Sequence, residues 1–283
     1  MTRTSVPYSR ASVSRLTNKA VVLARGLGTR MRASDGAAAL DAEQERAASA
    51  GMKAMIPVGR PFLDYLLSAL VDAGLGDVCI VIGPEHHEVR ERYGEAGTRA
   101  RISFAIQERS LGTADALLAV EGFTAGEEFV VLNSDNYYPT DVLERLASLG
   151  EPGLPAFGRL ALLADGSIAP ERIAGYALLD VTHDGYLRRI VEKPGPATLA
   201  EFGEDAFVSM NCWRFSKEIF AACRTVPPSS RGELEIPVAV QHAMDAYGLR
   251  FLTFPVHEGV LDLSRRSDVA LVRDRLAAIE PRP

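Results

Sequence analysis

The segment 19–24 (KAVVLA) is a short, apolar, β-branched run that leads directly into Arg25-Gly26-Leu27-Gly28-Thr29-Arg30. The run predicts a buried strand, and the two glycines predict a tight loop after it. Many nucleotide-binding α/β folds begin with a strand that ends in a glycine loop. This feature therefore favours an α/β fold with a ligand site at the edge of its sheet.

Apolar strands and amphipathic helices alternate through about residue 149. The sequence predicts strands at 78–82, 102–106 and 129–132, and helices at 61–73, 85–93 and 114–120. Such alternation is typical of a parallel sheet that is covered by helices on both faces.

The second half has a different pattern, because strand-like runs follow one another closely, with turn signals at Asp165-Gly166 and Asp184-Gly185. Strands are expected at 156–163, 176–179, 187–191, 207–215 and 250–255, and helices at 217–222, 236–247 and 266–279. We expect this half to add antiparallel strands to the same sheet. The predicted fold class is α/β: a single Rossmann-like domain with a mixed, mainly parallel central sheet flanked by helices.

Composition excludes several classes of protein. The chain has 283 residues, a formal charge of −6 and 47% hydrophobic residues, as in an ordinary globular protein. The acidic balance gives no general reason to bind nucleic acid or an anionic membrane. No apolar run reaches the roughly 18 residues that span a bilayer, and the three cysteines form no CxxC pair. We expect a cytoplasmic protein with buried thiols, and a homo-oligomer is compatible with the sequence.

Two segments lie outside this pattern. Residues 1–18 carry three arginines and no acidic residue, which predicts a disordered leader, although organellar transit peptides have a similar composition. Residues 34–51 are rich in Ala, Glu and Asp and have no large apolar side chain after Leu40. They are expected to stay outside the core, as an exposed helix or mobile excursion. Their position after the glycine loop makes them a candidate lid, and a tolerated surface insertion is the alternative.

The glycine loop does not fit two common phosphate-binding motifs. A dinucleotide fingerprint needs a third glycine where this chain has Met31, and a P-loop needs a Gly-Lys-Ser/Thr ending that is absent. The segment 23–31 (LARGLGTRM) instead resembles the L-A-x-G-x-G-T-R-M loop of sugar-1-phosphate nucleotidyltransferases.

Further motifs extend this resemblance from about Ala20 to Asp268. In the family's order they are Lys53-Ala54-Met55-Ile56-Pro57-Val58, Gln107 with Leu111-Gly112-Thr113-Ala114-Asp115-Ala116, Leu132-Asn133-Ser134-Asp135-Asn136, Gly175-Tyr176, Val191-Glu192-Lys193-Pro194, Asn211, Gly232-Glu233-Leu234-Glu235-Ile236 and Leu261-Asp262. An ordered set of motifs is far more specific than any one of them. No β-helix repeat follows Asp268, so we expect a stand-alone catalytic domain over residues 19–283. Its nucleotide-binding half would cover about 19–150 and its sugar-phosphate-binding half about 151–265.

The resemblance implies a reaction in which an NTP and a sugar 1-phosphate give an NDP-sugar and pyrophosphate, with Mg²⁺ as cofactor. It implies Arg30, Lys53 and Lys193 as catalytic cations and Asp135 and Asp262 as metal ligands. The implied nucleotide-binding residues are Ala24, Gly26, Leu27, Gly28, Thr29, Gln107, Gly112 and Thr113, and the implied sugar-phosphate-binding residues are Gly175, Glu192, Lys193 and Asn211.

Three questions stay open at the level of sequence. Gln107 offers a donor and an acceptor, which suits uracil or thymine and so favours UTP or dTTP, but its amide can also rotate to serve guanine. Arg25 stands where the family has a small residue, and it either adds a phosphate contact or obstructs the base. The alternative functions are CMP transfer to a non-sugar phosphate such as phosphocholine, and a regulatory subunit that binds nucleotide sugars without turnover.

Overall fold

A computed structural model describes residues 17–33, 38–94, 97–229 and 231–283. Nearly all of the expected leader, namely residues 1–16, lies outside the described residues, as do residues 34–37 of the alanine-rich segment. No helix of the described chain is long and apolar enough to cross a membrane.

The first half of the chain forms parallel strands in the order β3-β2-β1-β4. Their bounds are β1 (Lys19–Leu23), β2 (Asp77–Ile82), β3 (Arg101–Ile106) and β4 (Phe129–Asn133). Because β1 lies between β2 and β4, the loops that follow β1 and β4 leave the sheet at the same edge. The carboxyl ends of parallel strands beside such a reversal of strand order form the usual ligand crevice of α/β folds.

The second half extends the same sheet, mostly with antiparallel strands, in the order β10-β6-β9-β7-β8, while β11 pairs with β6 in parallel. The bounds are β6 (Gly153–Gly158), β7 (Ala177–Val181), β8 (Leu187–Val191), β9 (Phe207–Ser209), β10 (Cys212–Phe215) and β11 (Leu252–Val256). The predicted α/β class with a mixed sheet is confirmed.

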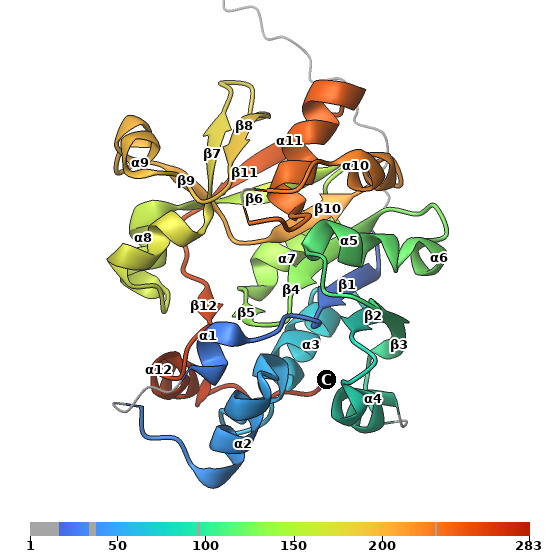
Figure 1. The fold of residues 1–283 in the computed structure, drawn as a ribbon, viewed down its shortest axis with the longest axis vertical. Coiled ribbons are helices and arrows are strands. Elements are labelled where there is room, and N and C mark those ends of the chain that lie inside the picture. Colours follow the sequence, from blue (N-terminus) through green and yellow to red (C-terminus); the bar gives the residue numbers. More distant parts are fainter. Residues whose placement is uncertain (1–16, 34–37, 95–96, 230) are drawn as a thin grey trace, which may run out of the picture.

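Helices cover both faces of the sheet (Figure 1). Alternate residues of β1 point to opposite faces: Ala20 and Val22 pack with α3, α4 and α7, whereas Val21 and Leu23 belong to the cluster of α5, α10 and α11. The helices are α3 (Phe62–Asp72), α4 (His87–Gly94), α5 (Thr113–Leu118), α7 (Thr140–Ala147), α10 (Ile219–Thr225) and α11 (Ile236–Tyr247).

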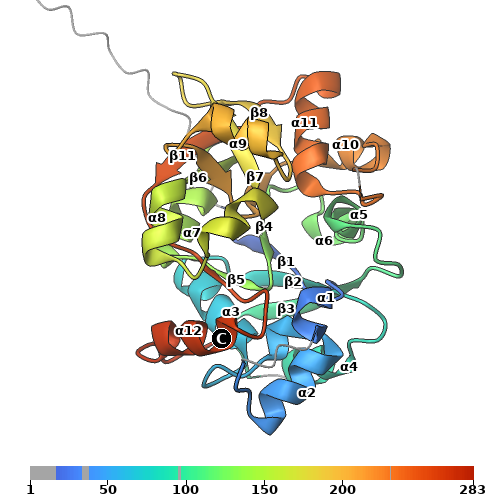
Figure 2. The same ribbon diagram turned by 60° about the vertical axis from the view of Figure 1, so that its left-hand side comes forward.

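Shorter elements complete the chain. They are α1 (Thr29–Arg32), α2 (Ala42–Ala50), the 3-10 turns η1 (Lys53–Met55) and η2 (Pro170–Gly175), α6 (Glu121–Thr124), α8 (Arg159–Asp165), α9 (Pro196–Phe202), α12 (Asp268–Leu276) and a two-stranded ladder of β5 (Asn136–Tyr137) with β12 (Leu261–Asp262). Figure 2 shows α1, α2 and α12 together at the end of the molecule opposite β8 and α11.

The expectation that residues 34–51 stay outside the core is wrong for α2. Ala47 and Ala48 are buried in a third apolar cluster with Met31, Ile56 and α12. Alanine is small enough for one face of the helix to pack closely, so the segment contributes core without a large apolar side chain. The lid interpretation stays a prediction.

Two of the expected strands differ from the structure. The run 156–163 is a strand only to Gly158, where α8 begins, because its Leu-Ala-Leu-Leu sequence contains strong helix formers and no β-branched residue. The run 207–215 is split into β9 and β10 at Asn211, which has a positive φ of 54°. A left-handed residue cannot continue a strand.

Candidate functional site

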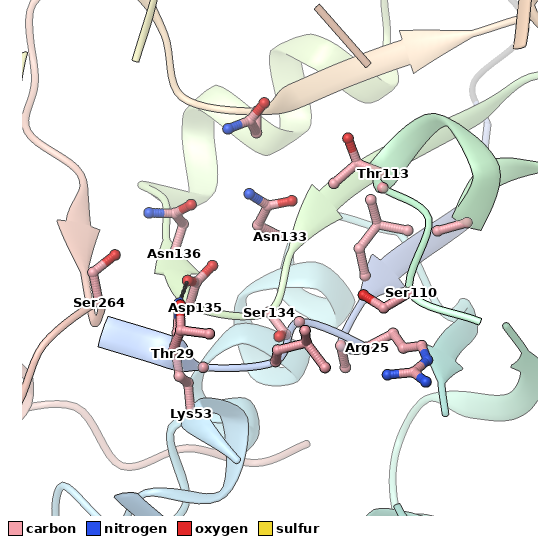
Figure 3. Close-up of a pocket in the computed structure, with 18 of the residues that line it drawn as sticks. Arg25, Thr29, Lys53, Ser110, Thr113, Asn133, Ser134, Asp135, Asn136 and Ser264 are labelled. Atoms are coloured by element: carbon pink, nitrogen blue, oxygen red, sulfur yellow. Dashed lines mark hydrogen bonds and ion pairs between the residues drawn. The ribbon is translucent and has the colours of Figure 1, made fainter. Parts of the chain in front are cut away.

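A cavity of about 330 Å³ opens at the carboxyl ends of β1 and β4. Every residue that the sequence predicts for the site lines it: Ala24, Gly26, Leu27, Gly28, Thr29, Arg30, Lys53, Gln107, Gly112, Thr113, Asp135, Gly175, Glu192, Lys193, Asn211 and Asp262. In the close-up, Lys53, Asp135 and Ser264 lie at one end, and Arg25, Ser110 and Thr113 at the other (Figure 3). The structure brings these residues together, and their individual roles stay predictions.

The glycine loop is shaped by close contact with the end of α2. Gly28 has a φ of +60°, and a Cβ atom there would lie 2.3 Å from the carbonyl oxygen of Gly51. Only glycine accommodates both the left-handed backbone and this approach. Gly28 also accepts the first hydrogen bond of α1, from the Arg32 amide at 2.8 Å, so α1 starts here and carries Arg30 into solvent beside the cavity.

Arg25 is held at the end of the cavity that lies away from Lys53 and Asp135 (Figure 3). Its Nε donates to the backbone oxygen of Gln107 at 2.9 Å, and its Nη1 lies 2.9 Å from Glu85 Oε1. The side chain is only 10% exposed. The ion pair with Glu85 and the bond to Gln107 thus fix the Arg25 guanidinium in the wall of the cavity.

Lys53 and Asp135 form an ion pair across the cavity. Lys53 extends from η1, and its Nζ donates to Asp135 Oδ2 at 2.6 Å (Figure 3). Asp135 follows the end of β4, and both side chains are mostly shielded from water. Shielding strengthens the pairing of opposite charges. The pair places one cation and one carboxylate beside the glycine loop.

Asp262 is a second, deeper carboxylate, only 2% exposed. Asn136 Nδ2 donates to its Oδ1 at 3.2 Å, and Ser264 Oγ donates to the same oxygen at 3.0 Å. The Tyr176 hydroxyl donates to Oδ2 at 2.7 Å, and the Arg172 guanidinium makes an ion pair with that oxygen. The β5–β12 ladder, in which Asp262 is the register partner of Asn136, brings this carboxylate close to Asp135.

The two carboxylates fit a site for a hard divalent cation. Burial, and then the negative charge of Asp135, raise the pKa of the Asp262 carboxyl above its ordinary value, whereas Arg172 lowers it. The two groups are therefore close enough to repel each other, and a cation would relieve that repulsion. Among the described residues, no group of three or more acidic, His or Cys side chains is arranged to hold a metal ion. Mg²⁺ needs none, because it uses one or two carboxylates together with phosphate oxygens.

A second cationic group comes from the later half of the chain. Lys193 follows β8 in a left-handed conformation with φ of +45°, and its Nζ lies 2.7 Å from Glu192 Oε1 and 2.5 Å from Glu235 Oε1. Burial raises the pKa of the Glu192 carboxyl, and Lys193 opposes that shift. Non-glycine residues with positive φ are uncommon and cluster at functional sites. Asn211, the other predicted residue of this half, also has a positive φ.

Gln107 and Thr113 have polar partners at the Arg25 end. Gln107 Nε2 donates to Gly112 O at 3.0 Å and to Asp115 Oδ2 at 2.7 Å. Thr113 Oγ1 accepts from the Ile236 amide at 2.9 Å and so caps the start of α11. Gly112 has φ of +120°, and a Cβ there would lie 2.4 Å from Leu234 O. This glycine is therefore required by backbone packing.

The sequence motifs gave no role to several residues that the structure places in or behind the site. Arg172 holds Asp262 and also Asp268, with Nη1 2.8 Å from Asp268 Oδ1. Arg231 and Glu235 both line the cavity, and Arg231 Nη1 lies 3.7 Å from Glu235 Oε1. Arg231 stands directly before the Gly232-Glu233 motif, so its charge was a usable signal, whereas nothing local marks Arg172.

Comparison with protein families gives a match over most of the chain. Residues 47–254 match the model of the family described as nucleotidyl transferase. The resemblance drawn from the motifs is thereby confirmed.

Individual relatives are distant. The chain is 29% identical over 231 residues to a glucose-1-phosphate thymidylyltransferase of Streptomyces antibioticus, covering 80% of this chain and 57% of that protein. It is 28% identical to a UTP–glucose-1-phosphate uridylyltransferase, AglF, of Haloferax volcanii, covering 78% of this chain and 82% of that one. The chain spans less than two thirds of the length of several of the relatives that it matches.

Solved structures support the fold. The crystal structure of a UDP-glucose pyrophosphorylase complexed with UDP-glucose superposes with a TM-score of 0.71, covering 93% of this chain and 99% of that one at 17% identity. The apo form of a UDP-glucose pyrophosphorylase gives a TM-score of 0.70. At this identity the likeness concerns the fold alone.

Proposed function

The chain belongs to the nucleotidyl transferase family, and from this premise we propose that it transfers a nucleoside monophosphate from an NTP to a sugar 1-phosphate. The products are an NDP-sugar and pyrophosphate. The names of the thymidylyltransferase and uridylyltransferase relatives favour dTTP or UTP as the donor.

One observation carries the proposal: lysines from the two halves of the chain line one cavity, and each is held by carboxylates. Lys53 pairs with Asp135, and Lys193 lies between Glu192 and Glu235. Two anionic substrates that must react with each other need this arrangement, because each requires its own counter-charge. A site for a single phosphate ligand would not.

The reaction requires charge neutralisation and alignment more than proton transfer. A phosphate oxygen of the sugar phosphate attacks the α-phosphorus, a new P–O bond forms, and the bond from that phosphorus to the bridging oxygen breaks. Pyrophosphate leaves with the electron pair. No general base is needed, since the attacking phosphate is already ionised at neutral pH.

The residues at the glycine loop divide this task. Arg30 and Lys53 would neutralise the triphosphate, with the loop backbone close to it. Asp135 and Asp262 would hold Mg²⁺, which when bound neutralises charge on the phosphates. Lys53 also keeps Asp135 in place through their ion pair.

The residues from the later half of the chain would hold the second substrate, the sugar 1-phosphate. Lys193 would bind the sugar phosphate, with Arg231 as a second cation nearby, and Glu192 would accept hydrogen bonds from sugar hydroxyls. Glu192 is well suited because it is mostly buried and close to Lys193. Gly175 and Asn211 also line the cavity and would complete the sugar site.

The test is pyrophosphate release with Mg²⁺ across a matrix of NTPs and phosphate acceptors. The NTPs are UTP, dTTP, GTP, CTP and ATP, and the acceptors are several hexose 1-phosphates and phosphocholine. The Asp135→Asn variant should fold and lose at least about 100-fold in turnover, since a metal-held charge stabilises the transition state by several kcal/mol. The matched control is Asp205→Asn, which changes an exposed aspartate outside the cavity.

Each outcome has a distinct meaning. Release that requires one NTP and one sugar phosphate supports the proposal and names both substrates. Release with CTP and phosphocholine alone would replace it with the alternative acceptor. Full activity in Asp135→Asn would refute the metal assignment, and binding without release from any pair would favour a regulatory subunit.

A further inference from the structure

The side-chain amide nitrogen of Gln107 has no hydrogen left for a ligand. An amide nitrogen carries two hydrogens. Nε2 of Gln107 donates one to Gly112 O at 3.0 Å and the other to Asp115 Oδ2 at 2.7 Å. Gln107 lines the cavity and is only 5% exposed. The two bonds therefore use both N–H donors of a side chain that is almost fully buried.

The chemistry of the partners fixes the orientation of this amide. A backbone carbonyl and a carboxylate oxygen are both acceptors, so neither can pair with Oε1. A flipped amide would bring three oxygens together and leave a buried N–H unpaired, which is costly. Among the described residues no group donates to Gln107 Oε1. Oε1 is therefore the atom that remains for a ligand.

We propose that Asp115 is a positioning residue for base selection, because it locks Gln107 so that the base meets an acceptor and never a donor. Asp115 does not line the cavity itself and acts only through Gln107. This inference rests on the proposed function, since it assumes that the cavity holds an NTP.

The backbone of Gln107 is also fixed. Its amide donates to Ile82 O at 2.9 Å, and its carbonyl oxygen accepts from Arg25 Nε at 2.9 Å. Arg25 lies with Ser110 at the end of the cavity away from Lys53 and Asp135 (Figure 3). This is the placement a base would need if its triphosphate is bound beside Lys53.

The proposal places Gln107 Oε1 against the ring nitrogen of the base, and an acceptor there selects bases by whether that nitrogen carries a hydrogen. Uracil, thymine and guanine carry an N–H on the ring edge, whereas cytosine and adenine have a lone pair there. The lone pair of cytosine N3 would face the lone pairs of Oε1. UTP and CTP are nearly equal in size and differ at this edge, so they are a matched pair of probes.

The experiment measures binding of UTP, CTP and 3-methyl-UTP to the full chain with Mg²⁺ by calorimetry, and turnover in parallel. The wild type should prefer UTP to CTP by about 10-fold or more and should bind 3-methyl-UTP as weakly as CTP, since an unmatched polar pair is costly. Asp115→Ala should reduce the UTP:CTP ratio to about twofold. Asp115→Asn keeps an acceptor at this position and should keep most of the ratio.

The control is Asp141→Ala, which also removes an aspartate from the first turn of a helix but lies away from the cavity. If Asp115 only stabilises α5, Asp115→Ala will lower Tm and weaken UTP and CTP equally, and the proposal is wrong. Equal binding of UTP and CTP to the wild type, or of 3-methyl-UTP and UTP, also overturns it. Binding without turnover would contradict the proposed function and leave this test intact.

Discussion

The contact between Gly28 and Gly51 is the most demanding local feature of the glycine loop. An alanine Cβ at residue 28 would meet the Gly51 carbonyl at 2.3 Å, and φ there is +60°. We expect Gly28→Ala to lower the free energy of unfolding by about 1–3 kcal/mol. Thermal unfolding measures this, with Gly26→Ala as control, because a Cβ at Gly26 meets nothing within 4 Å. Equal loss of stability in both variants would contradict the close contact.

The sequence motifs named many of the residues that line the cavity, but not their partners. Gln107 was expected to offer a donor and an acceptor, and only the structure shows that Asp115 and Gly112 occupy the donor. The sequence predicted Asp262 as a metal ligand, but it did not predict the ion pair with Arg172, which lies 90 residues away in the chain. Side-chain partners depend on rotamers and on distant backbone, so motif spacing cannot give them.

At the scale of elements, α2 ties the alanine-rich segment 34–51 to the glycine loop and α1. Asp41 caps the helix, Arg32 Nη2 donates to Ala50 O at 2.7 Å, and Ala48 is fully buried. Ala48→Glu should therefore lower the free energy of unfolding by about 3 kcal/mol, because it buries an unpaired charge. Urea unfolding checks this against Ala42→Glu, the same change at an exposed position of α2. Two equally stable variants would mean that α2 is not part of the core.

Elements with a strong local pattern were predicted closely, and those decided by tertiary contacts were not. The helix expected at 236–247 is α11 with the same bounds, and the strand expected at 187–191 is β8. The ladder of β5 and β12 was not predicted, because two-residue strands have no periodicity. The ladder forms because the tertiary fold brings Asn136 beside Asp262. This ladder sets the position of Asp262.

Across the whole molecule, one sheet runs through both halves of the chain. β4 of the first half pairs with β10 of the second over four residues. The sequence predicted parallel strands followed by antiparallel ones, but not their order, because strand order depends on which edges meet and not on local preference. The cavity takes residues from both halves, so its geometry depends on the complete sheet.

A ligand of this cavity should therefore stabilise the entire chain in one transition. UTP or dTTP with Mg²⁺, at 100 times its Kd, should add about 2.7 kcal/mol and raise Tm by about 5 °C. Calorimetry with and without EDTA checks this, and Asp135→Asn should lose the Mg²⁺-dependent part of the shift. If EDTA leaves the nucleotide shift unchanged, the cation does not bind with the nucleotide. If nucleotide shifts only one of two separate transitions, the halves unfold independently and the sheet does not couple them.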